Sequence, residues 1–124
     1  MSHHNKHAIM EACIKACQEC IDHCKACQSD ATHAHKKKCV SSCQRCIDAC
    51  RKCIEHCKEQ IRNAKTELDK IGWENCIAAC QNCIQMCERC CVSCPTDDTT
   101  ACSQACKDCI EACKDCIKAC SQCC

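Results

Sequence analysis

Cysteine recurs along this chain at alternating spacings of three and four residues, and this pattern constrains the fold more than any other feature. The spacing averages 3.5 residues, the period at which side chains return to one seam of an α-helix. Cysteine therefore occupies positions that leucine usually fills in a helical bundle. The repeats comprise Cys13, Cys17, Cys20, Cys24, Cys27; Cys39, Cys43, Cys46, Cys50, Cys53, Cys57; Cys76, Cys80, Cys83, Cys87, Cys90, Cys94; and Cys102, Cys106, Cys109, Cys113, Cys116, Cys120, Cys123.

The positions beside the cysteines complete a wide apolar face on each expected helix. With Cys13 at heptad position d, isoleucine falls at e in every repeat and alanine commonly falls at g, while charged and amide side chains fill most of b, c and f. Such a face packs against neighbouring helices and leaves the charged side in solvent. No segment alternates with period two, so the sequence predicts helices and no strands.

Breaks between the repeats predict an all-α, up-down-up-down four-helix bundle with a cysteine-lined core. Short connections between similar helices favour antiparallel neighbours. The sole glycine, Gly72, precedes the expected third helix, and the sole proline, Pro95, follows it. We expect a single domain over 8–124, preceded by a flexible His-containing tail over 1–7. The expected helices span about residues 8–28, 37–69, 73–94 and 98–122.

The same heptad frame predicts that the two ends of the bundle differ. Apolar side chains are expected to plug one end, and Met10 is interpreted there as core packing rather than as a ligand. These side chains are Ile9, Met10, Ile61, Leu68, Ile71 and Trp73. The other end is expected to be open and polar, so ions would enter there. It carries Cys27, Cys39, Cys94 and Cys102, with His33 and His35 in a loop over about 29–36.

Charge and hydropathy exclude several classes of partner. The formal net charge is +1 with acids and bases interspersed, which provides no electrostatic footprint for nucleic acid or for a membrane surface. No stretch is apolar enough to span a bilayer, and the N-terminus has no apolar export segment. We therefore expect a cytoplasmic protein, in which thiols stay reduced and serve metal or redox chemistry rather than a disulfide scaffold.

Thiolate is a soft ligand that selects Cu(I), Zn(II) or iron–sulfur clusters. Zinc favours isolated sites of four ligands, and four thiolates around Zn(II) leave two uncompensated negative charges. Cu(I) accepts two or three sulfurs, and thiolates can bridge between ions. Charge balance therefore favours multiple Cu(I) ions, on the order of ten to twenty-five per chain. A Zn(II) or mixed-metal thiolate buffer is the alternative function.

A redox or cluster-carrying enzyme is a third hypothesis with less support. The bacterial ferredoxin run of cysteines is absent, and only Cys87, Cys90, Cys94 and Pro95 imitate its tail. CxxC pairs such as Cys17/Cys20 lie inside expected helices and not at a helix N-terminus after a strand. No residue receives a catalytic role in this interpretation, so we expect a binding protein and not an enzyme.

The pattern CxxxCxxCxxxC on four consecutive helices resembles the copper storage proteins, four-helix bundles whose core cysteines hold many Cu(I) ions. The resemblance covers about residues 8–124, and over this range the chain is similar to the cytosolic branch of that family. It implies storage or detoxification of Cu(I) and assembly as a homotetramer. Copper ions and a copper chaperone are the candidate partners. It also implies an open end that bears His or Met. The doubled pairs Cys90/Cys91 and Cys123/Cys124 depart from the pattern.

Several residues off the seam are further candidate ligands. Cys91 and Cys124 fall at position e, where they either bind ions at the rim or pack as small residues. His23 and Met86 fall at position g near the expected open end, where each is either an auxiliary Cu(I) ligand or a half-buried flank residue. His33 and His35 are candidate ligands above the mouth. His56 is a weaker candidate at the plugged end.

The N-terminal histidines offer a separate hypothesis. A histidine stands third from the amino terminus whether Met1 is retained (His3) or removed (His4). That arrangement can bind Cu(II) or Ni(II) in a square-planar set of nitrogens. The competing interpretation is a disordered tail.

Overall fold

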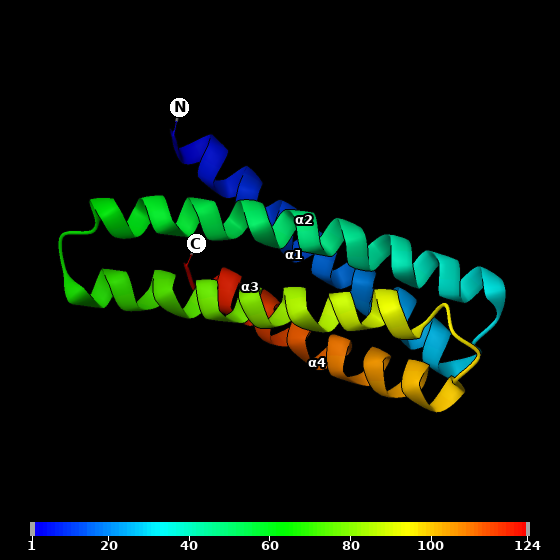
Figure 1. Cartoon of the computed structure of the whole chain (residues 1–124). Helices are drawn as coiled ribbons and strands as arrows, with labels where there is room; N and C mark the ends of the chain where they lie inside the picture. The colour runs from blue at the N-terminus through cyan, green and yellow to red at the C-terminus, as the bar shows by residue number, and fades with distance from the viewer. Residues whose placement is uncertain (1, 124) are drawn as a thin grey trace.

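Four antiparallel helices form a bundle in the computed structural model, which describes the backbone of residues 2–123 and the side chains of residues 8–123. Each helix packs against two neighbours, α1 and α3 both lying against α2 and α4, and residues 2–123 contain no strand. This arrangement confirms the predicted four-helix bundle. The helices are α1 (Ser2–Ser29), α2 (His33–Asn63), α3 (Glu67–Ser93) and α4 (Thr99–Cys123) (Figure 1).

The two ends of the bundle carry different numbers of connections. The α1–α2 connection (30–32) and the α3–α4 connection (94–98) share what we call the two-loop end. The α2–α3 connection (64–66) lies at the opposite, one-loop end, on the side of the molecule toward which both chain termini run (Figure 1). Consecutive helices therefore alternate in direction, as short connections require.

The α2–α3 connection comes earlier in the chain than the sequence predicts, so the expected boundaries of the helices over 37–69 and 73–94 are wrong at this turn. Thr66 is the N-cap of α3, and its hydroxyl accepts a hydrogen bond from the backbone N–H of Asp69 at 3.1 Å. This cap satisfies a helix-terminal donor, which a glycine cannot do with its side chain. Gly72 consequently lies inside α3 and does not mark its start.

The α1–α2 connection is also shorter than the loop predicted over 29–36. Thr32 is the N-cap of α2, and its side chain accepts a hydrogen bond from the backbone N–H of His35 at 3.1 Å. His33 and His35 therefore lie in the first turn of α2 and not in a loop. The cap again sets the helix start where sequence composition suggested irregular structure.

The start of α4 agrees with expectation, whereas α1 starts earlier than predicted. Asp98 precedes α4, and its carboxylate accepts a hydrogen bond from the backbone N–H of Ala101 at 3.0 Å, close to the predicted start at residue 98. In α1 the backbone is helical from Ser2, across the range where a flexible tail is expected. The side chains of residues 1–7 lie outside the described part of the chain.

Isoleucine and alanine flank the thiol core as the heptad pattern predicts. Ile47, Ile54 and Ile110 are buried, and so are Ala105 and Ala112. The other isoleucines of position e are half-buried and pack against the same core. The aliphatic side chains therefore seal the seams between neighbouring helices, while the centre of the bundle is left to sulfur.

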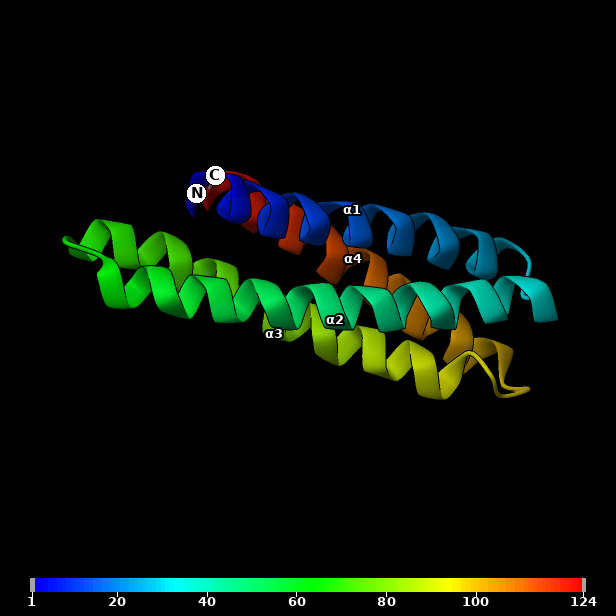
Figure 2. The ribbon, with the colours of Figure 1, turned by 90° about the horizontal axis from the view of Figure 1, so that it is seen from above.

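The one-loop end is only partly plugged. The α2–α3 hairpin extends beyond the ends of α1 and α4, as Figures 1 and 2 both show. Leu68 and Ile71 are 79% and 50% exposed, so their predicted place in an apolar plug is wrong. The early turn puts them on the first turns of α3, where the other helix pair does not reach. Met10 and Trp73 are buried as expected.

Candidate metal centre

The core cysteines bring their sulfur atoms together in one continuous column along the bundle. We call this the sulfur column, and it contains every cysteine of the described part of the chain except Cys91 and Cys123. Each of its side chains is at most 1% exposed. Contacts between neighbouring sulfurs range from 3.4 Å, between Cys94 and Cys102, to 4.0 Å, between Cys20 and Cys24.

Quartets of cysteines, one from each helix, form layers across the column. In one layer Cys17, Cys46, Cys83 and Cys113 have all their sulfurs within 4.8 Å of one another. Successive layers share ligands, because Cys17 and Cys83 also belong to a quartet with neighbouring cysteines of α2 and α4. The column is therefore a ladder of overlapping candidate sites and not a set of isolated ones.

Individual sulfurs are placed to bridge between several ions. The sulfur of Cys20 lies 3.6 Å from those of Cys43 and Cys109, and 4.0 Å from those of Cys24 and Cys87. These neighbours come from all four helices, one of them from α1 itself. A thiolate surrounded in this way can serve more than one metal ion.

The sulfur spacing fits shared metal ions without rearrangement of the helices. Two thiolates on one tetrahedral ion, each bonded at about 2.3 Å, are separated by about 3.8 Å. The observed contacts of 3.4 to 4.0 Å include that value. A disulfide needs sulfurs about 2.05 Å apart, and every described cysteine is a free thiol. The clustered sulfurs of the column can therefore hold metal ions through thiolate.

The core provides no cation of its own to balance thiolate charge. In the described part of the chain, Ser42 is the only buried polar or charged side chain. Ion pairs such as Lys58–Glu55 and Lys114–Glu111 lie on the surface, within single helices. An uncompensated buried charge is costly. The sulfurs of this column must therefore either stay protonated as thiols or, as thiolates, be balanced by metal ions.

Burial and thiol–thiol hydrogen bonds set the protonation of the column. Burial is the largest cause that raises the pKa of Cys27 and of Cys91. Deeper in the core, the hydrogen bond to Cys109 is the largest cause that raises the pKa of Cys87, and the one to Cys113 lowers that of Cys109. A hydrogen bond between two thiols raises the pKa of one partner and lowers that of the other. Burial acts in the same direction on every thiol and favours its neutral form.

The metal-free fold should lose stability as pH rises above about 9.0, the ordinary thiol pKa. Below that value both folded and unfolded thiols are protonated, so the contribution of burial is fully present. Above it the unfolded chain ionises first, because the pKa values of Cys27 and Cys91 are raised in the fold. Anaerobic urea unfolding at pH 7, 9 and 10 should show a falling midpoint. A midpoint that rises over this range would contradict neutral buried thiols.

His23 lies in the seam between α1 and α2 and faces a hydroxyl. Its Nδ1 forms a hydrogen bond with the Oγ of Ser42, whose side chain is buried. Arg45 also donates to this hydroxyl, at 3.3 Å. Sequence reasoning did not identify Ser42, although it shares position g with His23. The structure thus gives His23 a polar partner of its own, and its role as a metal ligand stays a prediction.

The two-loop end is more closed than the sequence predicts. Cys27 and Cys102 are 1% exposed, and Cys39 and Cys94 are fully buried. At this end, the Nζ of Lys36 in α2 donates to the backbone carbonyl of Thr96 in the α3–α4 connection at 2.8 Å. The expected open mouth is therefore covered in this conformation, and the four thiols below it join the sulfur column.

The histidines of the two-loop end lie above this covered group of thiols. His35 is half-buried, and its Nδ1 donates to the backbone carbonyl of Asp30 at 2.6 Å. His33 is exposed and lines a groove of about 400 Å³ with Lys36 and Pro95. Neither imidazole is brought into the sulfur column, and their role as ligands stays a prediction.

The remaining candidate ligands lie at the edge of the column or outside the described residues. Met86 is half-buried and packs against the core from its flank. Cys91 is also half-buried, and its thiol donates to the backbone carbonyl of Val40 at 3.9 Å. This contact agrees with its predicted off-axis position. The side chains of His3, His4 and Cys124 lie outside the described part of the chain.

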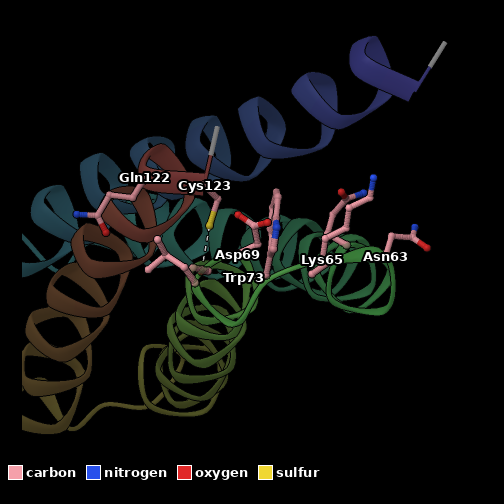
Figure 3. A pocket seen from close by; sticks show the side chains of 10 residues that line it. Asn63, Lys65, Asp69, Trp73, Gln122 and Cys123 are labelled. Atoms are coloured by element: carbon pink, nitrogen blue, oxygen red, sulfur yellow. Dashed lines mark hydrogen bonds between the residues drawn. The ribbon is translucent and has the colours of Figure 1, made fainter.

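A pocket of about 500 Å³ opens at the one-loop end, between the α2–α3 hairpin and the end of α4 (Figure 3). The half-buried thiol of Cys123 lies at its edge and donates to the backbone carbonyl of Gly72 at 3.1 Å. Trp73 also lines this pocket. The ring of His56 lies edge-on to the ring of Trp73, at a centroid distance of 5.8 Å. Within the described residues, the buried Nε2 of His56 has no hydrogen-bond partner.

Met10 adds a further sulfur next to the column, although the sequence analysis interpreted it as core packing. Its side chain is fully buried, and the thiol of Cys53 donates to its Sδ at 3.7 Å. Met10 is thus in contact with the cysteine sulfurs as well as being part of the core. Its place in the heptad, three residues before Cys13 and on the same seam, is the signal that could have identified it.

Comparisons with protein-family models, with curated proteins and with solved structures give no match to this chain. None of the helices, as far as they are described, combines the length and apolarity of a membrane span. The sulfur column consists of closely clustered, buried cysteines that can hold several metal ions through thiolate sulfur.

Proposed function

We propose that this protein stores Cu(I), binding many ions along the sulfur column without catalytic turnover. The observation that carries the proposal is the continuity of the column: overlapping quartets of buried sulfurs, with no charged side chain buried in the described part of the chain. Such a core needs several soft cations whose total charge approaches the number of thiolates they bind.

Charge balance favours Cu(I) over Zn(II) in this core. One Zn(II) in a quartet such as Cys17, Cys46, Cys83 and Cys113 leaves a net charge of −2, with no cationic side chain buried nearby. Stacking such layers one turn apart repeats that charge along a low-dielectric axis. Cu(I) ions bridged by thiolates bring each layer to neutrality as loading approaches one ion per cysteine.

The sharing of sulfurs supports the same choice. Zinc structural sites are closed sets of four ligands, whereas the quartets here have members in common, and Cys20 contacts four other sulfurs. Two- and three-coordinate Cu(I) can occupy successive positions along such a ladder. The resemblance of the repeats to copper storage proteins points to the same function, including storage or detoxification.

An anaerobic titration of the fully reduced protein with Cu(I), against a strong competing chelator, tests the proposal. Metal and thiol would be counted on the gel-filtered product. We expect Cu(I) to be taken from the chelator up to roughly one ion per one or two cysteines. Saturation after only a few ions would contradict a store.

A parallel titration with Zn(II) tests the alternative function, a zinc or mixed-metal buffer. If zinc fills sites of four thiols each and resists displacement by Cu(I), the protein is a zinc buffer. We expect the opposite order, with Cu(I) displacing Zn(II) from a core that provides only sulfur ligands.

A further inference from the structure

The last layer of the column to which all four helices contribute sulfur contains a thioether. On α1 the position three residues before Cys13 is Met10, which contacts Cys53 of α2, and Cys53 in turn contacts Cys76 of α3 and Cys120 of α4. The Sδ of Met10 is 3.7 Å from the sulfur of Cys53. That sulfur is 3.7 Å from Cys76 and 3.8 Å from Cys120, which are 3.6 Å apart.

These distances match those of the all-cysteine layers. In the layer that contains Cys17, consecutive sulfurs are separated by 3.6 to 3.7 Å. Met10 is fully buried, and the contact of its Sδ with Cys53 shows that its sulfur faces the column. A methionine that only filled space could point its sulfur in any direction, because its side chain is flexible and apolar.

We infer that Met10, Cys53, Cys76 and Cys120 form a mixed thioether–thiolate Cu(I) site. The inference rests on the proposed function and adds a ligand type that the rest of the column lacks. A thioether is soft and neutral, and it suits Cu(I) while zinc sites use thiolate, imidazole or carboxylate. With three thiolates in place of four, this layer also needs less positive charge to reach neutrality.

The position of this site explains why a neutral ligand belongs there. Beyond it the core continues with Cys57, Trp73 and the ring of His56, and Trp73 also lines the pocket of the one-loop end. The buried thiol of Cys57 follows this layer and hydrogen-bonds with Cys53 and Cys76, so an ion here has complete sulfur layers on one side and fewer sulfurs on the other. Fewer thiolates therefore leave less residual charge beside the aromatic side chains.

Selenomethionine labelling provides a direct test, because selenium reports its own metal neighbours. The chain has three methionines, Met1, Met10 and Met86. Labelled protein would be loaded anaerobically with Cu(I) and measured by selenium-edge X-ray absorption. We expect copper in the selenium shell of the unmodified sequence and of M86L, and its loss in M10L. Leucine conserves the side-chain volume in both variants, so the bundle should be retained.

The outcomes separate this inference from the proposed function. Full Cu(I) uptake without a copper–selenium shell, or with a shell that persists in M10L, overturns the thioether site alone. Failure of the unlabelled protein to take up Cu(I) overturns the proposed function and the site with it. A loss of about one ion in M10L, and none in M86L, is the capacity change we expect.

Discussion

Cu(I) loading is expected to raise the thermal unfolding midpoint of this protein by at least ~20 °C. The metal-free core consists largely of thiols, which bury little apolar surface, and the aliphatic side chains occupy only its flanks. One site held at a thousandfold excess over its Kd adds about 4 kcal/mol, and about 1 kcal/mol shifts the midpoint of a domain this size by roughly 3–5 °C. Several strong sites therefore give a large shift.

Anaerobic circular dichroism at 222 nm on metal-free and loaded protein measures this shift. Mg(II) provides the control, because a hard cation has little affinity for thiolate and should leave the midpoint unchanged. Equal midpoints for the metal-free and Cu(I)-loaded forms would mean that the ions bind outside the core, since only ions within it link the four helices.

The double variant C46A/C83A is expected to lose about two to four Cu(I) ions. Cys46 lies 3.6 Å from both Cys17 and Cys83, and Cys83 lies 3.7 Å from Cys113, so the two substitutions break one layer in the middle of the column. The neighbouring sulfurs also lose their bridging partners. Alanine is the strongest helix former, which helps α2 and α3 to remain helical.

The matched control for this experiment is C91A. The thiol of Cys91 contacts the backbone of Val40 from position e and is half-buried, so its removal should change the capacity by no more than about one ion. Metal and thiol counted on the gel-filtered proteins compare the two variants. Equal losses per cysteine removed, in C46A/C83A and in C91A, would show that capacity follows cysteine number and not position in the column.

The bundle was predictable because one residue type marks nearly every core position. The three–four spacing identifies the side of each helix that faces inward. No other sequence feature is needed to predict that this side is buried. The isoleucines at position e, such as Ile47 and Ile110, then follow as seams between helices. The same spacing predicts the clusters of sulfur, since antiparallel helices of similar length must bring their cysteines together.

The turns were harder to predict because they depend on single capping contacts. Thr66 and Thr32 set the starts of α3 and α2 through side-chain hydrogen bonds to backbone N–H groups. Gly72 is a stronger signal by composition, yet it lies within α3, whose start the Thr66 cap sets. The error moved Leu68 and Ile71 from a predicted plug to the exposed first turns of α3.

Contacts between side chains of neighbouring helices also could not be predicted from the sequence pattern. The hydrogen bond between His23 and Ser42 depends on the rotation of α1 against α2, which a single-helix frame does not contain. Met10 was interpreted as apolar packing because methionine fills that role in most cores. Its contact with Cys53 becomes evident only when the register of α1 against α2 is known.

Diffraction at the copper absorption edge from crystals of the Cu(I)-loaded protein would locate the bound ions within the bundle. We expect a row of anomalous peaks along the bundle axis, running from the thiols around Cys27 and Cys102 at the two-loop end to the layer of Met10 at the other. Peaks confined to surface histidines such as His33, or a few isolated peaks each within a closed set of four cysteines, would contradict a continuous Cu(I) store.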